Sequence, residues 1–147
     1  MTHLIFLSMT LALSAQADAD KDSLHERAMA RQSDLILGIY LTTDAVERIF
    51  TLERDAAAML RDYGFTLVTI EVYRSGQIVP IEHLARVRDY FRDHGFEVAG
   101  GIATTPGGDT GVRQKGPLAW YNWQNPKTQH DLEEIMRSVA PLFDTFV

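Results

Sequence analysis

One short pattern occurs twice in the chain, and this repeat constrains the fold more than any other feature. The segments RDYGF (61–65) and RDHGF (92–96) start 31 residues apart. Each ends a stretch with helical spacing of apolar residues and leads into an apolar run. One strand and one helix of a (β/α) barrel take about 30 residues, since about 250 residues make eight such units. The repeat therefore predicts alternating strands and helices around a parallel sheet.

Three segments are the candidate strands. Residues 35–41 form a continuous apolar run, residues 67–72 are rich in β-branched side chains, and residues 98–103 are apolar and small. Continuous hydrophobicity is typical of a strand that is buried on both faces, as in a parallel sheet. Residues 144–147 have the pattern of a fourth strand that is only beginning.

The segments between these strands carry helix signals. We expect Thr51 to cap a helix over residues 52–63, which Gly64 ends in the left-handed conformation. Pro80 suits the first turn of a second helix, which Gly95 ends. A third helix carries the apolar positions of residues 132–143, after a long loop over 104–126.

The predicted fold is α/β: a partial TIM (β/α)8 barrel with about three β-α units, the start of strand four, and parallel strands. An open doubly wound sheet shows the same alternation, but neither GxGxxG nor a P-loop follows the first strand. Three strands cannot close a barrel, and exposed edges favour aggregation. We therefore expect residues 35–147 to be the N-terminal part of a truncated barrel domain, with a small open sheet as the alternative.

The N-terminus has the pattern of a secretory signal. Residues 4–13 are mostly apolar, and Ala15-Gln16-Ala17 is a small-x-small cleavage pattern. This predicts a signal peptide over 1–17, a polar leader over 18–34, and a secreted or periplasmic protein. The apolar run is shorter than the roughly 20 residues that span a bilayer, so we expect no membrane association after cleavage. The alternative is a buried first helix or strand.

Composition narrows the possible chemistry. The chain has no cysteine, which excludes disulfides, thiolate metal sites and a cysteine nucleophile. Its formal charge of −6, without a basic patch, argues against nucleic-acid binding. None of the five histidines follows a strand or pairs with another at a metal-ligand spacing, and we expect them on helix surfaces. We expect no metal and no cofactor, and no Ser-His-Asp arrangement can be proposed.

Ligands of parallel α/β folds bind at the carboxyl ends of the strands, and this rule selects the candidate site residues. The candidate catalytic residue is Glu71. The candidate substrate-binding residues, grouped by the strand that they follow, are Tyr40 and Thr42, then Tyr73 and Arg74, then Thr104, Thr105, Trp120, Tyr121 and Trp123.

Glu71 is the sharpest of these candidates, because a carboxylate in an otherwise apolar strand costs free energy unless it is paired. One interpretation is a catalytic carboxylate or an acceptor for sugar hydroxyls. The other is a structural ion pair with Arg74 at the top of the barrel.

The segment Trp120-Tyr121-Asn122-Trp123 holds both tryptophans of the chain. Aromatic rings with a polar edge suit the C–H faces of sugars, which indicates carbohydrate contact. The alternative is a hydrophobic plug that folds the long loop onto the barrel. The glycine-rich stretch 106–111 lacks the spacing of a phosphate-binding loop and is interpreted as flexible.

Four segments resemble those of a known protein family: IEVYRSG (70–76), EVAGGIATT (97–105), WYNWQNP (120–126) and LFDTFV (142–147). In these segments the chain resembles the N-terminal part of bacterial secreted (β/α)8-barrel glycoside-hydrolase-like proteins. The resemblance implies a carbohydrate substrate and hydrolysis by paired carboxylates. It also implies that the second catalytic carboxylate follows Val147, and that residues 1–147 alone are therefore inactive. The alternatives are an exported non-catalytic carbohydrate-binding protein and a different barrel hydrolase or isomerase.

Overall fold

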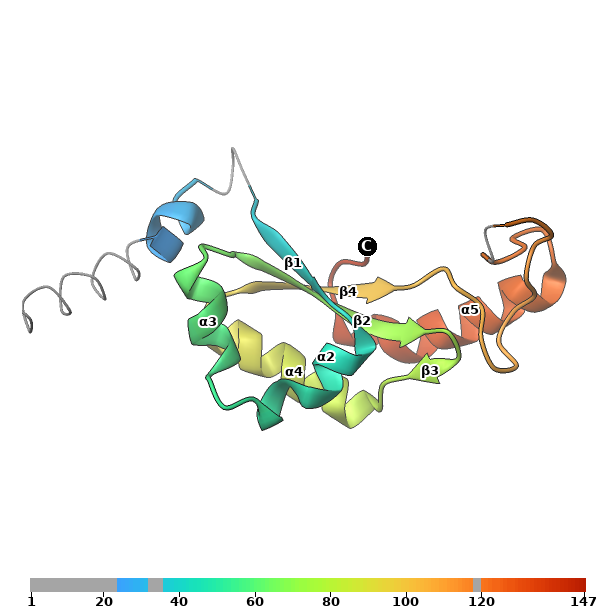
Figure 1. The fold of residues 1–147 in the computed structure, drawn as a ribbon, viewed down its shortest axis with the longest axis horizontal. Helices are drawn as coiled ribbons and strands as arrows, with labels where there is room; N and C mark the ends of the chain where they lie inside the picture. Colours follow the sequence, from blue (N-terminus) through green and yellow to red (C-terminus); the bar gives the residue numbers. More distant parts are fainter. Residues whose placement is uncertain (1–23, 32–35, 118–119) are drawn as a thin grey trace, which may run out of the picture.

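A computed structural model describes residues 24–31, 36–117 and 120–147, and the predicted signal segment 1–17 lies outside these residues. Its centre is an open, mostly parallel sheet (Figure 1). Strand β2 (Leu67–Arg74) is central, with β1 (Gly38–Leu41) parallel on one side and β4 (Glu97–Ile102) parallel on the other. The alternation that the repeat predicted is confirmed.

The last residues extend this sheet beyond β4. The Gly100 N–H donates to the Thr145 carbonyl at 2.9 Å, the Val147 N–H donates to the Gly100 carbonyl at 2.9 Å, and Gly100 and Phe146 form a parallel bridge. The expected start of strand four therefore lies where it was predicted. The order β1, β2, β4 and residues 145–147 follows the chain without the reversal of a doubly wound sheet, and it is compatible with a partial barrel.

The helices lie against the sheet in the order of the chain. They are α2 (Thr43–Arg48), α3 (Ala56–Asp62), α4 (Ile81–Asp93) and α5 (Pro126–Val139), with 3₁₀ turns at Ile49–Thr51 and Ala140–Leu142. Figure 1 shows α2, α3 and α4 on one side of the sheet. Right-handed crossovers between consecutive parallel strands place successive helices on the same face.

The core lies between this helical layer and the sheet. Val68, Ile70 and Val72 alternate along β2 and are fully buried, as are Leu84 and Val87 on α4. Successive side chains of a strand point to opposite faces, so the alternate residues of β2 face away from the helices. These residues include Thr69 and Glu71, which precede the register shift between β2 and β4 at residues 71–73, and their face carries the candidate site.

The first β-α connection differs from the prediction. Thr51 was expected to cap a helix, but it ends a 3₁₀ turn, and the Asp55 carboxylate caps α3 by accepting from the Ala58 N–H at 2.7 Å. Helix α2 was not predicted, and Val46 on this helix and Ile49 just after it are both buried. A six-residue helix has little stability of its own and depends on this packing.

A second difference is the short strand β3 (Gln77–Ile78), which runs antiparallel to the end of β2 and was not predicted. Ser75 and Gly76 form the turn between them, both with positive φ. Pro80 is the residue before α4 and not part of its first turn. The predicted helix ends at Gly64 and Gly95 are confirmed, with φ of 75° and 83°.

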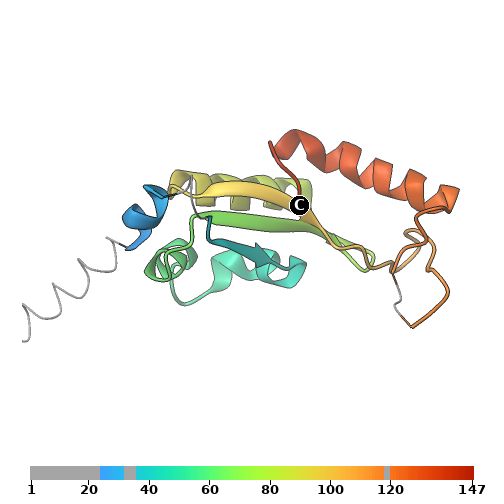
Figure 2. The same ribbon diagram turned by 90° about the horizontal axis from the view of Figure 1, so that it is seen from above.

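The predicted polar leader contributes a helix over residues 24–29. Figures 1 and 2 show it at the end of the sheet opposite to the 104–125 loop. His25 is buried there: its Nδ1 lies 2.8 Å from the Phe65 carbonyl, and its ring contacts that of Phe96 at 5.1 Å between centroids. The expectation that the histidines lie on helix surfaces is therefore wrong for His25. Its polar sequence context gave no sign of this burial.

Within the described ranges, no helix has the length and apolar character that a membrane span requires.

Alanine at Gly100 tests the pairing of strand four. An ideal Cβ at this position would lie 2.5 Å from Cε1 of Phe146, so the ring or the strand would have to move. We expect Gly100→Ala to lower the free energy of unfolding by about 1–3 kcal/mol, the usual cost of overpacking. Chemical denaturation of the intact protein measures this change.

Gly38→Ala is the matched control, because its Cβ would meet only the flexible Leu67 side chain, at 3.3 Å. Phe146→Ala in the Gly100→Ala background should restore part of the lost stability. Equal costs for the two glycine variants, with no relief from Phe146→Ala, would contradict the pairing.

Candidate functional site

The candidate residues lie at the carboxyl ends of β1, β2 and β4, which share one end of the sheet. Figure 2 shows that the 104–125 loop and the start of α5 lie at this same end. The site therefore combines side chains on regular strands with side chains on a long loop.

Glu71 is the centre of the strand part of the site, and its carboxylate accepts four hydrogen bonds. Oε1 accepts from the Tyr40 hydroxyl at 3.1 Å and from Arg74 Nη2 at 2.7 Å. Oε2 accepts from Arg74 Nε at 2.8 Å and from the Thr43 N–H at 2.8 Å. The side chain is fully buried. The predicted pair with Arg74 therefore exists, and it is bidentate.

These contacts explain how an apolar strand accommodates a carboxylate. A buried charge is tolerated when it is paired and its remaining lone pairs are filled. The hydrogen bond to Glu71 raises the pKa of the Arg74 guanidinium. Burial, and then the charge of Glu71, raise the pKa of Tyr40, so its hydroxyl stays protonated as a donor.

Tyr40 and Arg74 differ from Glu71 in accessibility. Tyr40 is 40% exposed, and the Arg74 side chain is 44% exposed. A Cβ at Gly101 would lie 2.7 Å from Tyr40 Cε2 and 2.8 Å from Tyr40 Oη. The Tyr40 ring thus lies over β4 at a position where only glycine leaves room for it.

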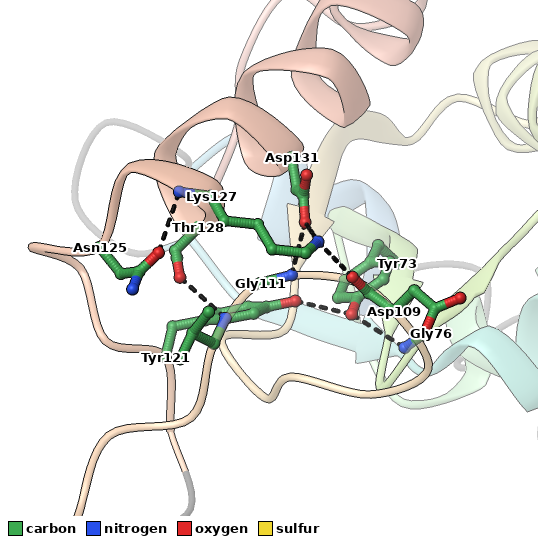
Figure 3. Close-up of polar contacts among 10 residues, drawn as sticks. Tyr73, Gly76, Asp109, Gly111, Tyr121, Asn125, Lys127, Thr128 and Asp131 are labelled. Carbon is green, nitrogen blue, oxygen red and sulfur yellow. Dashed lines mark hydrogen bonds and ion pairs between the residues drawn. The ribbon is translucent and has the colours of Figure 1, made fainter.

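Tyr73 and Tyr121 contact each other in the interior of the protein. Both side chains are fully buried, and the Tyr121 hydroxyl donates to the Tyr73 hydroxyl at 2.6 Å (Figure 3). The Tyr73 oxygen also accepts from the Gly76 N–H at 2.8 Å. Burial, and then the bond to Tyr73, raise the pKa of Tyr121. Neither ring is accessible to a ligand in this structure, and both join the long loop to β2.

The loop is held to the first turns of α5 by polar contacts (Figure 3). Asp131 accepts from the Gly111 N–H at 2.7 Å and pairs with Lys127, which also donates to the Asp109 carbonyl. The buried Thr128 hydroxyl accepts from the Val112 N–H at 2.9 Å. Residues 109–112 are therefore ordered by α5, although the sequence interpretation made this stretch flexible.

The two tryptophans remain at the surface. Trp120 is 49% exposed and Trp123 is 52% exposed, and the Trp123 ring packs edge-to-face on Tyr121 at 5.8 Å between centroids. Trp123 also lines a small apolar hollow of about 120 Å³ with Thr104, Leu132 and Met136. In this segment Tyr121 is buried and joins the loop to β2, while both tryptophans are about half exposed.

The threonines of the predicted set are spread over the same edge. Thr42 is exposed at the cap position of α2, without a side-chain capping bond. Thr104 is exposed, and its carbonyl accepts from the Tyr121 N–H at 3.3 Å. The Thr105 hydroxyl lies 3.1 Å from that of Ser75, which joins the loop to the turn after β2.

Sequence reasoning missed several residues that build this edge: Gln77, Lys127, Thr128 and Asp131. It found Thr43 among the residues after the first strand, but not how Thr43 acts. Thr43 acts through its backbone N–H, which no side-chain pattern reveals. Asn125-Pro126 marks the start of α5, with the Asn125 carboxamide accepting from the Lys127 N–H at 2.9 Å. That signal could have placed the other α5 residues in its first turns. Among the described residues, no group of three or more acidic or histidine side chains could hold a metal ion.

The fold is that of an α/β protein compatible with a partial barrel, and polar and aromatic side chains lie at the carboxyl end of its sheet. Residues 22–147 match the family described as "Probable glycosyl hydrolase, catalytic domain", and the chain belongs to this family. No curated protein and no solved structure matches it. The resemblance to glycoside hydrolases that the sequence motifs indicated is confirmed at the level of the family.

The contacts of Asp131 predict that the conformation of the long loop changes with pH. The hydrogen bond from Lys127, and next that from Gly111, lower the pKa of Asp131. A lowered folded-state pKa means that the contact stabilises the loop above the usual carboxyl pKa of about 4 and is lost as the pH falls further. Both tryptophans lie in this loop, so we expect their fluorescence to change below about pH 4.

Asp131→Asn should show the acid-state fluorescence already at neutral pH, while the far-UV circular dichroism stays native. Asp109→Asn is the matched control, because Asp109 contributes its backbone carbonyl to the Lys127 contact. A native spectrum for Asp131→Asn at neutral pH would argue against this role for Asp131.

Proposed function

We propose that the protein hydrolyses glycosidic bonds and that its glycan substrate binds across the carboxyl ends of β1, β2 and β4. The supporting observation is that the chain belongs to a glycosyl hydrolase family and has exposed side chains at this end of the sheet: Tyr40 and Arg74 at the strand ends, and Trp120 and Trp123 on the long loop. Aromatic rings fit the C–H faces of sugars, and a guanidinium donates to sugar hydroxyls.

The proposed reaction uses two carboxylates. One protonates the leaving oxygen, and the other acts as a nucleophile or activates water. Glu71 is the buried carboxylate of this edge, and two roles are open to it: a catalytic carboxylate, or the residue that holds Arg74 and Tyr40. The resemblance implies a second carboxylate after Val147, and the inactivity of residues 1–147 alone stays a prediction. The assays below therefore use the full-length protein.

An exported carbohydrate-binding protein without catalysis would use the same edge. A panel of soluble glycans, assayed with the intact protein for new reducing ends and for binding by calorimetry, separates the two functions. Release of reducing ends supports the hydrolase. Binding without release across the panel would support the second function instead.

We also propose that the protein is exported, on the pattern of residues 1–17. Protein recovered from the expressing cells should begin at Asp18, because the predicted cleavage follows Ala17. N-terminal sequencing measures this directly. Mature protein that still carries Met1 or Thr2 would be evidence against the signal.

Trp123→Ala tests the glycan-binding surface. Loss of one stacking ring should raise KM about 2- to 12-fold with little change in kcat, because such aromatic contacts contribute about 0.5–1.5 kcal/mol beyond buried area. Steady-state kinetics on the best glycan of the panel measure the change. The melting temperature of the variant shows whether its packing on Tyr121 survives.

Tyr63→Ala is the matched control, because this tyrosine is 67% exposed just after α3, on the helical layer. Its KM should stay at the wild-type value. An unchanged KM for Trp123→Ala would exclude Trp123 from the substrate surface.

A further inference from the structure

We infer that Glu71 is a positioning residue, and that the groups it holds, the Arg74 guanidinium and the Tyr40 ring, contact the sugar. This inference rests on the proposed function, because it assigns roles within the same substrate-binding edge. It chooses between the two roles that are open to Glu71.

The first argument is accessibility. Glu71 is fully buried, and each of its oxygens already accepts two hydrogen bonds from protein groups. A catalytic carboxylate must come within about 3 Å of the reacting atom or of one intervening water. Tyr40 or Arg74 would have to move away before Glu71 could do so. These two residues, in contrast, are each about two-fifths exposed at the same place.

The second argument is the geometry of the guanidinium. Nε and Nη2 of Arg74 both face Glu71, at 2.8 and 2.7 Å. The group is planar, so the Nη1 side points away from the carboxylate. An arginine fixed along one edge offers its other donors in a set direction, and it loses less conformational freedom when a ligand binds.

The third argument concerns Tyr40. Its hydroxyl is directed to Glu71, and its ring lies over Gly101, where a Cβ would approach the ring to 2.7 Å. Tyr40, Thr69 and Ala99 are register partners across the three strands, on the face that the helices leave uncovered. The ring is therefore presented on this face as a flat apolar surface with its polar end fixed.

The charges at this edge indicate the class of glycan. The Arg74 charge is compensated by Glu71, and the carboxylate of Asp44 also acts on Arg74. At Arg74 these two carboxylates remove the net attraction to an anion. The structure therefore favours neutral sugars, bound through hydroxyls and C–H faces, over uronic acids or sulfated glycans.

The decisive experiment compares Glu71→Gln, Arg74→Ala and the double variant in the intact protein. An amide keeps one acceptor oxygen and turns an NH₂ group toward donors, so Arg74 loses its fixed position. We expect Glu71→Gln to lower kcat/KM about 10- to 100-fold, the range of hydrogen bonds to charged groups, mainly through KM. The double variant should lose clearly less than the product of the two single effects, because Glu71 acts in part through Arg74.

A catalytic carboxylate would behave differently. Glu71→Gln would then lower kcat about 1,000-fold or more with KM little changed. Azide or formate would restore turnover to Glu71→Ala by taking the place of the lost carboxylate. Either result would overturn the positioning role, and so would effects of Glu71→Gln and Arg74→Ala that multiply in the double variant.

Arg92→Ala is the matched control. Arg92 makes a similar carboxylate pair, with Asp144 at 2.7 Å, and its side chain is 39% exposed, but it lies on α4 outside the proposed site. Its kinetics should stay at the wild-type values. If Glu71→Gln does not fold, Arg74→Lys is the alternative variant. It should also raise KM, because lysine cannot form the bidentate pair with Glu71.

A spectroscopic measurement separates this inference from the proposed function. The charge of Glu71 contributes to the raised pKa of Tyr40, so NMR titration of ¹³C-labelled tyrosine should find that pKa lower in Glu71→Gln. An unchanged Tyr40 titration in Glu71→Gln would refute the inference that Glu71 positions Tyr40. If wild-type protein hydrolyses no glycan, the proposed function fails, and calorimetry with neutral and acidic glycans still decides whether Arg74 and Tyr40 bind sugar.

Discussion

The buried carboxylate of Glu71 is the interaction on which this end of the molecule depends. It joins β1 through Tyr40, the start of α2 through the Thr43 N–H, and the end of β2 through Arg74. Removing any one donor would leave part of a buried charge unpaired, which costs far more than an exposed pair contributes. The ends of these elements are therefore positioned together, and the exposed parts of Tyr40 and Arg74 acquire fixed places.

A second set of contacts holds the long loop against the same edge. The Tyr73–Tyr121 bond ties the loop to β2, and Asp131 with Thr128 ties it to α5. Tyr121 is buried, whereas Trp120 and Trp123 on the same loop remain about half exposed. The chain belongs to a family of glycosyl hydrolase catalytic domains, which supports the proposal that this aromatic surface binds carbohydrate.

The elements that the sequence predicted correctly are those with a strong local pattern. Helix α4 has a full apolar stripe and a glycine after it, and β2 and β4 have apolar runs of sufficient length. Helix α2 and strand β3 were missed, since six-residue and two-residue elements are stabilised by their neighbours and not by their own propensity. His25 was misplaced for the same reason, because its burial comes from Phe65 and Phe96, far along the chain.

The sequence by itself determined the alternation of strands and helices, the helix ends at Gly64 and Gly95, and the end of the sheet where polar side chains gather. It also showed that Glu71 needed a partner, because an unpaired charge in a buried strand is too costly. Only the tertiary structure decided that three different elements donate to this carboxylate, and that Tyr40 and Arg74 stay exposed while Tyr73 and Tyr121 are buried. Such distinctions depend on distances between residues about 30 to 50 positions apart, which no local pattern encodes.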